Sequence, residues 1–158
     1  MQASDGGRLP IYCDTSPCLQ RMKEGLGESL NLYEPVAFLR DHVLGRLTLN
    51  PVDETVAIHA TCSTRRMGLD HDLITIAKQC ARKVVVLDQV GCCGFGGDRG
   101  FEVPELNAAA LKDLKSSLPD ECRNGYSTSR TCEIGLSLHS GIHYRSIVYL
   151  VARAASSV

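Results

Sequence analysis

Four cysteines have the residue type and spacing for shared metal chemistry: Cys62, Cys92, Cys93 and Cys132. Soft thiolates suit iron–sulfur clusters and zinc, and four of them from three separate segments match the ligand count of a cluster. Because neighbouring Cα atoms lie about 3.8 Å apart, the adjacent Cys92 and Cys93 cannot easily close a normal disulfide. The structural alternative is four buried thiols, since free cysteine is among the most buried residue types.

Glycines surround the adjacent cysteines in the segment GCCGFGGDRG, which covers 91–100. They let the backbone approach closely and turn its N–H groups toward sulfur, so we expect four of them to line the cofactor: Gly91, Gly94, Gly96 and Gly97. A phosphate-binding turn is the alternative, because the segment follows a predicted strand and precedes a predicted helix. That alternative is weaker, since Arg99 stands where the third glycine of a G-x-G-x-x-G motif would fall.

Arginines lie within a few residues of the predicted ligands, namely Arg65, Arg66, Arg99 and Arg130. One hypothesis is that Arg99 and Arg130 contact the cofactor and offset the negative charge of a thiolate-ligated cluster. Such charges would raise its reduction potential and lower the pKa values of the thiols. The alternative is ordinary solvated surface charge.

The other cysteines and histidines predict less chemistry. Cys80 falls on the apolar stripe of a predicted helix and is expected in the core, whereas Cys122 lies among charged residues and is expected at the surface. His59, inside a predicted strand, is expected to be a hydrogen-bonded core histidine. His139 and His143 are four apart and could share one helical face. Their distance from the cysteines matches no zinc-binding spacing, so we expect two solvent-facing side chains.

Strands and helices alternate along the chain. The apolar pattern predicts strands at 9–14, 55–60, 84–87 and 123–127, and helices at 34–45, 69–80, 104–118 and from about 131, with a final apolar segment at 147–152. In the helix predicted over 104–118, the apolar side chains are expected to face inward, beginning with Leu106. This alternation predicts an α/β, layered, Rossmann-like fold with a mostly parallel sheet and flanking helices. Such sheets place their working loops at the carboxyl ends of the strands, where the cysteine segments fall.

The composition is typical of one compact domain. Of 158 residues, 44% are hydrophobic and 22% are charged, and the net charge of −1 shows no basic footprint for nucleic acid. The longest apolar stretch has six residues, too few for a membrane span. Residues 1–8 lack the apolar core of a signal peptide. We therefore expect reduced thiols and a cytoplasmic location, peripheral at most to the inner membrane face.

A weak internal repeat divides the chain. CDTSPC (13–18) precedes an apolar segment near 32–39, much as STSRTC (127–132) precedes one near 144–151. We therefore expect 9–50 to be the tail of a first repeat, 51–158 to be a complete second repeat, and 1–8 to be a disordered start or the edge of a fragment. The whole would be one compact unit excised from a larger protein.

The cysteine pattern resembles a known family. Cys62, the Cys92–Cys93–Gly94 run and Cys132 are similar to the cysteine-rich CCG module of iron–sulfur oxidoreductases, which include heterodisulfide reductase and glycolate oxidase iron–sulfur subunits. CDTSPCLQRMKEGL, VDETVAIHATCS, GCCGFGGDRGF and GYSTSRTCEIGLSLHSGI look most like the C-terminal end of FAD-linked D-lactate dehydrogenases. The resemblance covers nearly the whole chain.

This resemblance implies an iron–sulfur cluster held by the four cysteines. The family's last element is commonly C-x-x-C, whereas here Gly135 stands in the final position, which favours a four-thiolate [4Fe–4S] cluster. Cys18 matches the terminal cysteine of the preceding repeat and is expected to lack partner ligands.

The implied function is electron transfer in a flavin-dependent 2-hydroxy-acid dehydrogenase. Electrons would pass from FAD, bound on a domain of the parent protein, through ferredoxin-like iron–sulfur centres toward a quinone or cytochrome. These residues show no flavin or lactate site, so the chain alone is not expected to oxidise lactate. Two alternatives are a catalytic cluster domain of the heterodisulfide-reductase type and a non-redox zinc or assembly domain.

Overall fold

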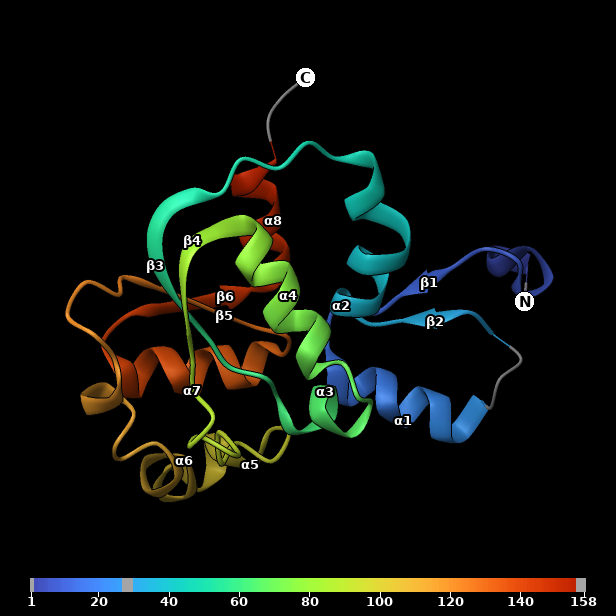
Figure 1. Cartoon of the computed structure of the whole chain (residues 1–158). Coiled ribbons are helices and arrows are strands. Elements are labelled where there is room, and N and C mark those ends of the chain that lie inside the picture. Colours follow the sequence, from blue (N-terminus) through green and yellow to red (C-terminus); the bar gives the residue numbers. More distant parts are fainter. Residues whose placement is uncertain (1, 27–29, 156–158) are drawn as a thin grey trace.

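A four-stranded, all-parallel sheet forms the centre of the protein. The computed structural model describes residues 2–26 and 30–155, and its strands run in the order β4-β3-β5-β6 (Figure 1). The strands are β3 (Val52–Ile58), β4 (Ala81–Val86), β5 (Asn124–Ser127) and β6 (His143–Ser146). The predicted α/β, layered, Rossmann-like architecture is therefore confirmed.

Each face of this sheet is covered by helices. Val56 and Ile58 of β3 are fully buried on one face, beneath α4 (Asp70–Cys80), α8 (Ile147–Ala154) and α2 (Pro35–Phe38). Ala57 points to the opposite face, into a second core that includes Tyr144 of β6 and Leu136 of α7 (Arg130–Ser140). Successive side chains of β3 therefore alternate between two cores, as expected for a buried parallel strand.

A second, two-stranded parallel sheet precedes the main one. It pairs β1 (Ile11–Tyr12) with β2 (Leu32–Tyr33), and α1 (Ser16–Leu26) connects them. After α2 the helical path continues as a π-helical turn, Leu39–Val43, and a 3-10 turn, Leu44–Arg46. Gln2–Gly7 forms short 3-10 turns, while Met1 and 156–158 lie outside the described residues.

The strand order fixes where a site belongs. From β3 the chain passes through α3 (Cys62–Arg66) and α4 to β4 on one side. It then crosses through α5 (Arg99–Glu102) and α6 (Pro104–Ala110) to β5 on the other side. The order therefore reverses between β3 and β5, and in open parallel sheets ligands bind beyond the carboxyl ends of such strands.

Two local expectations were wrong. The helix predicted over 104–118 ends at Ala110, and Leu106 is 49% exposed rather than inward. Cys122 is buried in the second core and not at the surface, because its side chain packs under the sheet although its sequence neighbours are charged. The alternative in which His139 and His143 share a helical face does not hold, since His143 begins β6, where it is exposed as expected.

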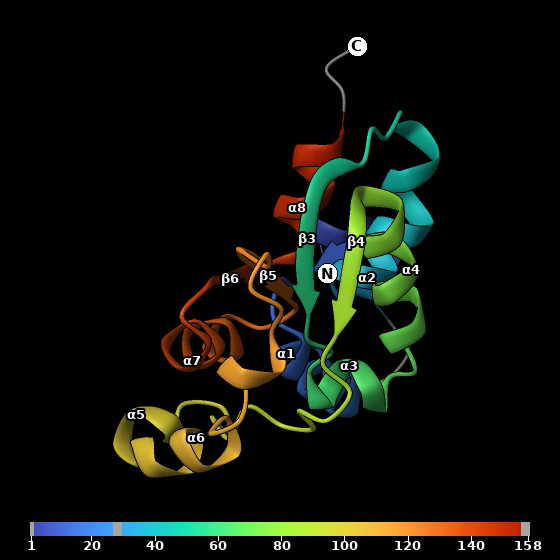
Figure 2. The same cartoon turned by 60° about the vertical axis from the view of Figure 1, so that its left-hand side comes forward.

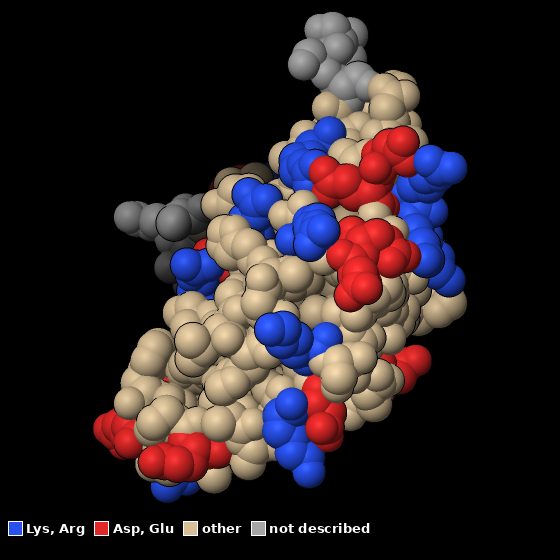
Figure 3. All heavy atoms as spheres, turned by 90° about the vertical axis from the view of Figure 1, so that its left-hand side faces the viewer, with Lys and Arg blue, Asp and Glu red and all other residues tan. Residues whose placement is uncertain are grey.

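The surface is mixed in charge. On the face drawn in Figure 3, Lys and Arg side chains lie among Asp and Glu side chains. The surface ion pairs include Arg82 with Asp53. No helix in the described part of the chain is long and apolar enough to cross a bilayer.

Candidate functional site

Hydroxyl groups tie together the loops that follow β3 and β5. The Thr128 hydroxyl lies 3.1 Å from that of Thr61 and 2.6 Å from that of Thr64. Ser127 donates a hydrogen bond of 2.9 Å to the carbonyl of His59. These side chains are buried, so the bonds are sheltered from water and hold the two loops in one arrangement.

Two of the predicted ligands lie in the first turns of helices at this junction. Cys62 is the first residue of α3, where the Thr61 hydroxyl caps the helix by accepting a bond of 3.2 Å from the Thr64 N–H. Cys132 is the third residue of α7. Cys62 is exposed and Cys132 is 6% exposed, so the junction presents one thiol to solvent and one to the interior.

The other two ligands lie in the glycine turn after β4. Gly94 has a φ of +72°, a left-handed backbone conformation that residues other than glycine rarely adopt. Its N–H donates to the Cys92 sulfur at 3.4 Å, which fits the expectation that this turn aims backbone N–H groups at sulfur. Cys92 is exposed, whereas Cys93 is buried.

Cys93 and Cys132 meet directly, although 38 residues separate them in the chain. Their Sγ atoms lie 2.9 Å apart and share a hydrogen bond, and all eight cysteines are free thiols. A disulfide needs about 2.05 Å, and two thiolates on one tetrahedral zinc lie roughly 3.8 Å apart. The observed distance lies between these values, so a small shift either way would reach one of them.

The two thiols of this pair titrate together. The hydrogen bond shared with Cys132 lowers the pKa of Cys93 to about 7, although burial opposes the shift. The same hydrogen bond, together with burial, raises the pKa of Cys132, and the Cys62 thiol raises it further. One proton therefore leaves the pair near neutral pH while the other is retained, which pairs a nucleophilic thiolate with a proton donor.

The donor set fits a thiolate-bound group in kind, but the side chains do not yet surround one point. Among the described residues, no group of three or more His, Cys, Asp or Glu side chains is arranged to hold a metal ion. The thiols of Cys93 and Cys132 are in contact. Cys62 is close enough to raise the pKa of Cys132, and Cys92 is close enough to lower the pKa of Cys93. The buried Ser129 hydroxyl lies beside Cys132 and lowers the pKa of that thiol, against the larger opposing effects of Cys93 and burial.

The arginines are distributed unevenly around the site. Arg99 and Arg130 are exposed, and Arg130 pairs with Glu133 at 3.4 Å. Arg65, half-buried on α3, reaches the glycine turn and donates to the carbonyl of Val90 at 3.5 Å. Its charge and, more strongly, burial lower the pKa of His59 to about 4, so His59 is a neutral core side chain as expected.

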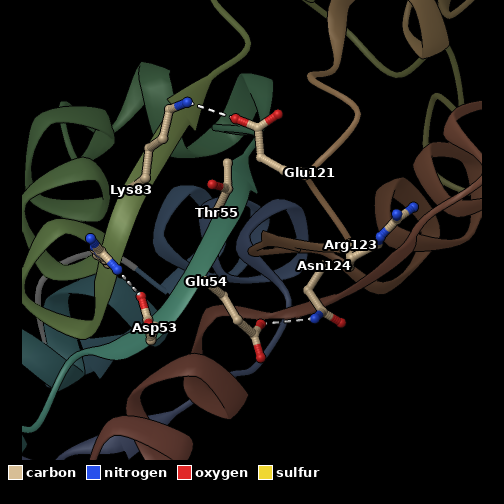
Figure 4. A pocket seen from close by; sticks show the side chains of 8 residues that line it. Asp53, Glu54, Thr55, Lys83, Glu121, Arg123 and Asn124 are labelled. Atoms are coloured by element: carbon tan, nitrogen blue, oxygen red, sulfur yellow. Dashed lines mark hydrogen bonds and ion pairs between the residues drawn. The ribbon is translucent and has the colours of Figure 1, made fainter.

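A polar pocket at the amino ends of the strands offers no comparable chemistry. It has a volume of about 530 Å³ and is lined by charged side chains, including Asp53, Glu54, Lys83 and Glu121 (Figure 4). Lys83 pairs with Glu121 at 2.7 Å, and Asn124 donates to Glu54 at 3.0 Å. These charged side chains pair with one another and leave no reactive group among the described residues of the pocket. The thiols described above lie at the opposite, carboxyl end of the sheet.

Comparison with known proteins adds no relative: no family model matches the chain, and neither a curated protein nor a solved structure matches it. The resemblance to the CCG module therefore rests on the residues quoted above.

Proposed function

We propose that Cys62, Cys92, Cys93 and Cys132 bind an iron–sulfur cluster of the [4Fe–4S] type, and that the chain is an electron-transfer module. The observation that carries this proposal is the meeting of Cys93 and Cys132 at the reversal of strand order, where Cys62 is close enough to shift the pKa of Cys132 and Cys92 to shift that of Cys93. Thiolates delivered from three loops at one sheet end are the arrangement that cluster ligation requires.

The burial of the four thiols suits electron transfer. Two are buried and two are exposed, so a bound group would have one side in the protein and one side near the surface. The buried side keeps water from the sulfurs, and the exposed side brings the group within reach of a partner. Arg65, next to the glycine turn, supplies positive charge that would stabilise the reduced, more negative state.

The resemblance supplies the wider proposal. The module would belong to an FAD-linked, D-lactate-like 2-hydroxy-acid dehydrogenase, and would pass electrons from the flavin and ferredoxin-like domains of the parent protein toward a quinone or cytochrome. When bound, the cluster accepts and releases single electrons. A reducing compartment such as the cytoplasm fits free thiols with this role.

The test is anaerobic reconstitution of the chain with iron and sulfide, followed by metal and sulfide analysis, visible absorbance and EPR. We expect about four irons and four sulfides per chain. Cys92→Ser and Cys132→Ser should lose most of this content, because each removes one of four thiolates. Full retention in both variants would show that the ligand assignment is wrong, and binding of zinc without visible absorbance would favour the structural alternative.

The distance between Cys93 and Cys132 favours thiol–disulfide chemistry as a second candidate function. In that reaction the two protein thiols reduce a substrate disulfide to two thiols and become a disulfide themselves. A chain that binds no iron but reversibly closes this disulfide would support the second candidate over the first.

A further inference from the structure

Helix α6 buries only one of its seven residues, and that residue is polar. Asn107 is 2% exposed, whereas Leu106 on the same helix is 49% exposed. A short helix packed for stability would bury its leucine and expose its asparagine. The reversed pattern indicates that α6 is positioned by what Asn107 contacts.

Asn107 lies between two parts of the cysteine site. Its amide nitrogen donates a hydrogen bond to the carbonyl of Cys93. Its amide also covers Gly135 of α7, where an added Cβ would lie 2.4 Å from the amide nitrogen and 3.0 Å from the amide oxygen. Gly135 is three residues after Cys132, so one side chain contacts both the backbone of Cys93 and the helix that carries Cys132.

A second close contact fixes α6 against the glycine turn. A Cβ on Gly94 would lie 2.4 Å from the backbone oxygen of Leu106 and 2.8 Å from the Cβ of Ala110. The backbone of α6 therefore rests on Gly94 while its one buried side chain reaches past it. Figure 2 shows α5 and α6 together beneath α7, away from the body of the sheet.

We propose that Asn107 is a positioning residue that sets the distance between Cys93 and Cys132 by bridging the Cys93 carbonyl and Gly135. Asn107 also fills the space that a side chain at position 135 would need. A cysteine at that position would therefore not fit, and the site is restricted to its existing four thiols. The proposal concerns the same site as the proposed function but depends on the thiol geometry and not on the presence of a cluster.

The experiment measures how readily the metal-free chain closes the Cys93–Cys132 disulfide. The chain is equilibrated anaerobically with oxidised and reduced glutathione, so that two protein thiols and one glutathione disulfide give one protein disulfide and two glutathione thiols. Mass spectrometry of differentially alkylated peptides reports the disulfide in this pair alone. The equilibrium constant gives the effective concentration of one thiol at the other.

Two variants of Asn107 separate its hydrogen bond from its shape. Asn107→Leu keeps the side-chain size without the donor, and Asn107→Ala removes both. We expect each to lower the effective concentration by about tenfold or more, since misplacement of reacting groups by about 1 Å has effects of at least this size. Ala109→Leu, at an exposed position of the same helix, is the matched control and should leave it unchanged.

Gly135→Ala distinguishes positioning from general stability. The new methyl group must displace Asn107, so this variant should lower the effective concentration in the natural chain but have no further effect in Asn107→Ala. Circular dichroism confirms that each variant is folded. The proposal is wrong if Asn107→Leu matches the natural chain, if Gly135→Ala acts equally in both backgrounds, or if the natural chain closes no such disulfide.

Discussion

Two stretches of the molecule have the same order of elements and differ in what covers them. β1-α1-β2-α2 and β5-α7-β6-α8 each pair two parallel strands around a connecting helix of 11 residues. In both helices a cysteine is the third residue, Cys18 in α1 and Cys132 in α7. The following helix is capped by a side chain in each case, by Glu34 before α2 and by Ser146 before α8.

The two cysteines nevertheless lie in different surroundings. Cys132 is buried against Cys93, whereas the exposed Cys18 thiol makes no hydrogen bond within the described part of the chain. The segment between β4 and β5, which carries the glycine turn, α5 and α6, rests on α7 (Figure 2). A strand–helix unit with a cysteine is therefore not enough to form a site. Whether a site forms depends on the segment that covers the unit.

The largest expected difference between the two stretches is in iron content. Cys132→Ser should lose most of the iron and sulfide bound on anaerobic reconstitution, because it removes a buried ligand that contacts Cys93. Cys18→Ser is the matched control, since it makes the same change at the same position of the other helix. Equal losses in both variants would show that α1 also contributes a ligand.

Glycine-to-alanine changes in the two helices should have opposite effects on stability. Gly135→Ala should cost roughly 1–3 kcal/mol, because its methyl group overlaps Asn107 in a packed site. Gly25→Ala, in α1, meets open space and should stabilise the chain by up to about 1 kcal/mol through helix propensity. Urea unfolding of both variants measures the difference, and a stabilising Gly135→Ala would contradict the close packing.

The framework of the fold could be predicted because its signals are local. The buried end of β3 is the apolar run Val56–Ile58, and α4 carries its apolar stripe at helical spacing, so both elements were found. β6 was missed because it reads HYRS, with only Tyr144 fully buried. The prediction that Leu106 of α6 faces inward was wrong, because apolar periodicity cannot tell which face of a helix is covered when one asparagine determines the packing.

The site could be predicted from the sequence only in part, because its contacts join residues that are far apart in the chain. Segment positions at strand ends could indicate that Cys93 and Cys132 belong to one end of the sheet, but not that their sulfurs meet. The contact made by Asn107 joins residues far apart in the chain, and nothing in its local sequence distinguishes it. Assignment of the bound group stays a prediction, as does the division into repeats.

The buried carboxyl group of Glu34 should make the stability of the first stretch depend on pH. Burial raises the pKa of Glu34 above its ordinary value, against hydrogen bonds from Ala37 and Ser16 that lower it. The folded state therefore keeps the Glu34 proton to higher pH than the unfolded state, and this contribution to stability is lost as pH rises from about 4.5 through the folded pKa.

Glu34→Gln should flatten that dependence because glutamine does not titrate yet can still accept a bond from the Ala37 N–H. Thermal unfolding from pH 4 to pH 8 would measure the change, which we expect to be smaller than the effect at Gly135. Glu133 in the second stretch, whose pKa burial also raises, keeps its own contribution and serves as an internal control. An unchanged profile would show that Glu34 does not titrate in this range.

The smallest effect is expected at the corresponding cap of the second stretch. The Ser146 hydroxyl accepts a bond of 3.4 Å from the Val148 N–H, a longer bond than the 2.7 Å bond from Ala37 to Glu34. Loss of an ordinary serine cap costs about 1 kcal/mol, and a long hydrogen bond contributes less than a short one. Ser146→Ala should therefore lower the free energy of unfolding by less than Glu34→Ala, which also leaves the buried Ser16 hydroxyl without its carboxylate partner. If Ser146→Ala proved the more damaging in urea unfolding, the second stretch would depend on its cap more than its packing indicates, and the two strand–helix units would differ in stability as well as in chemistry.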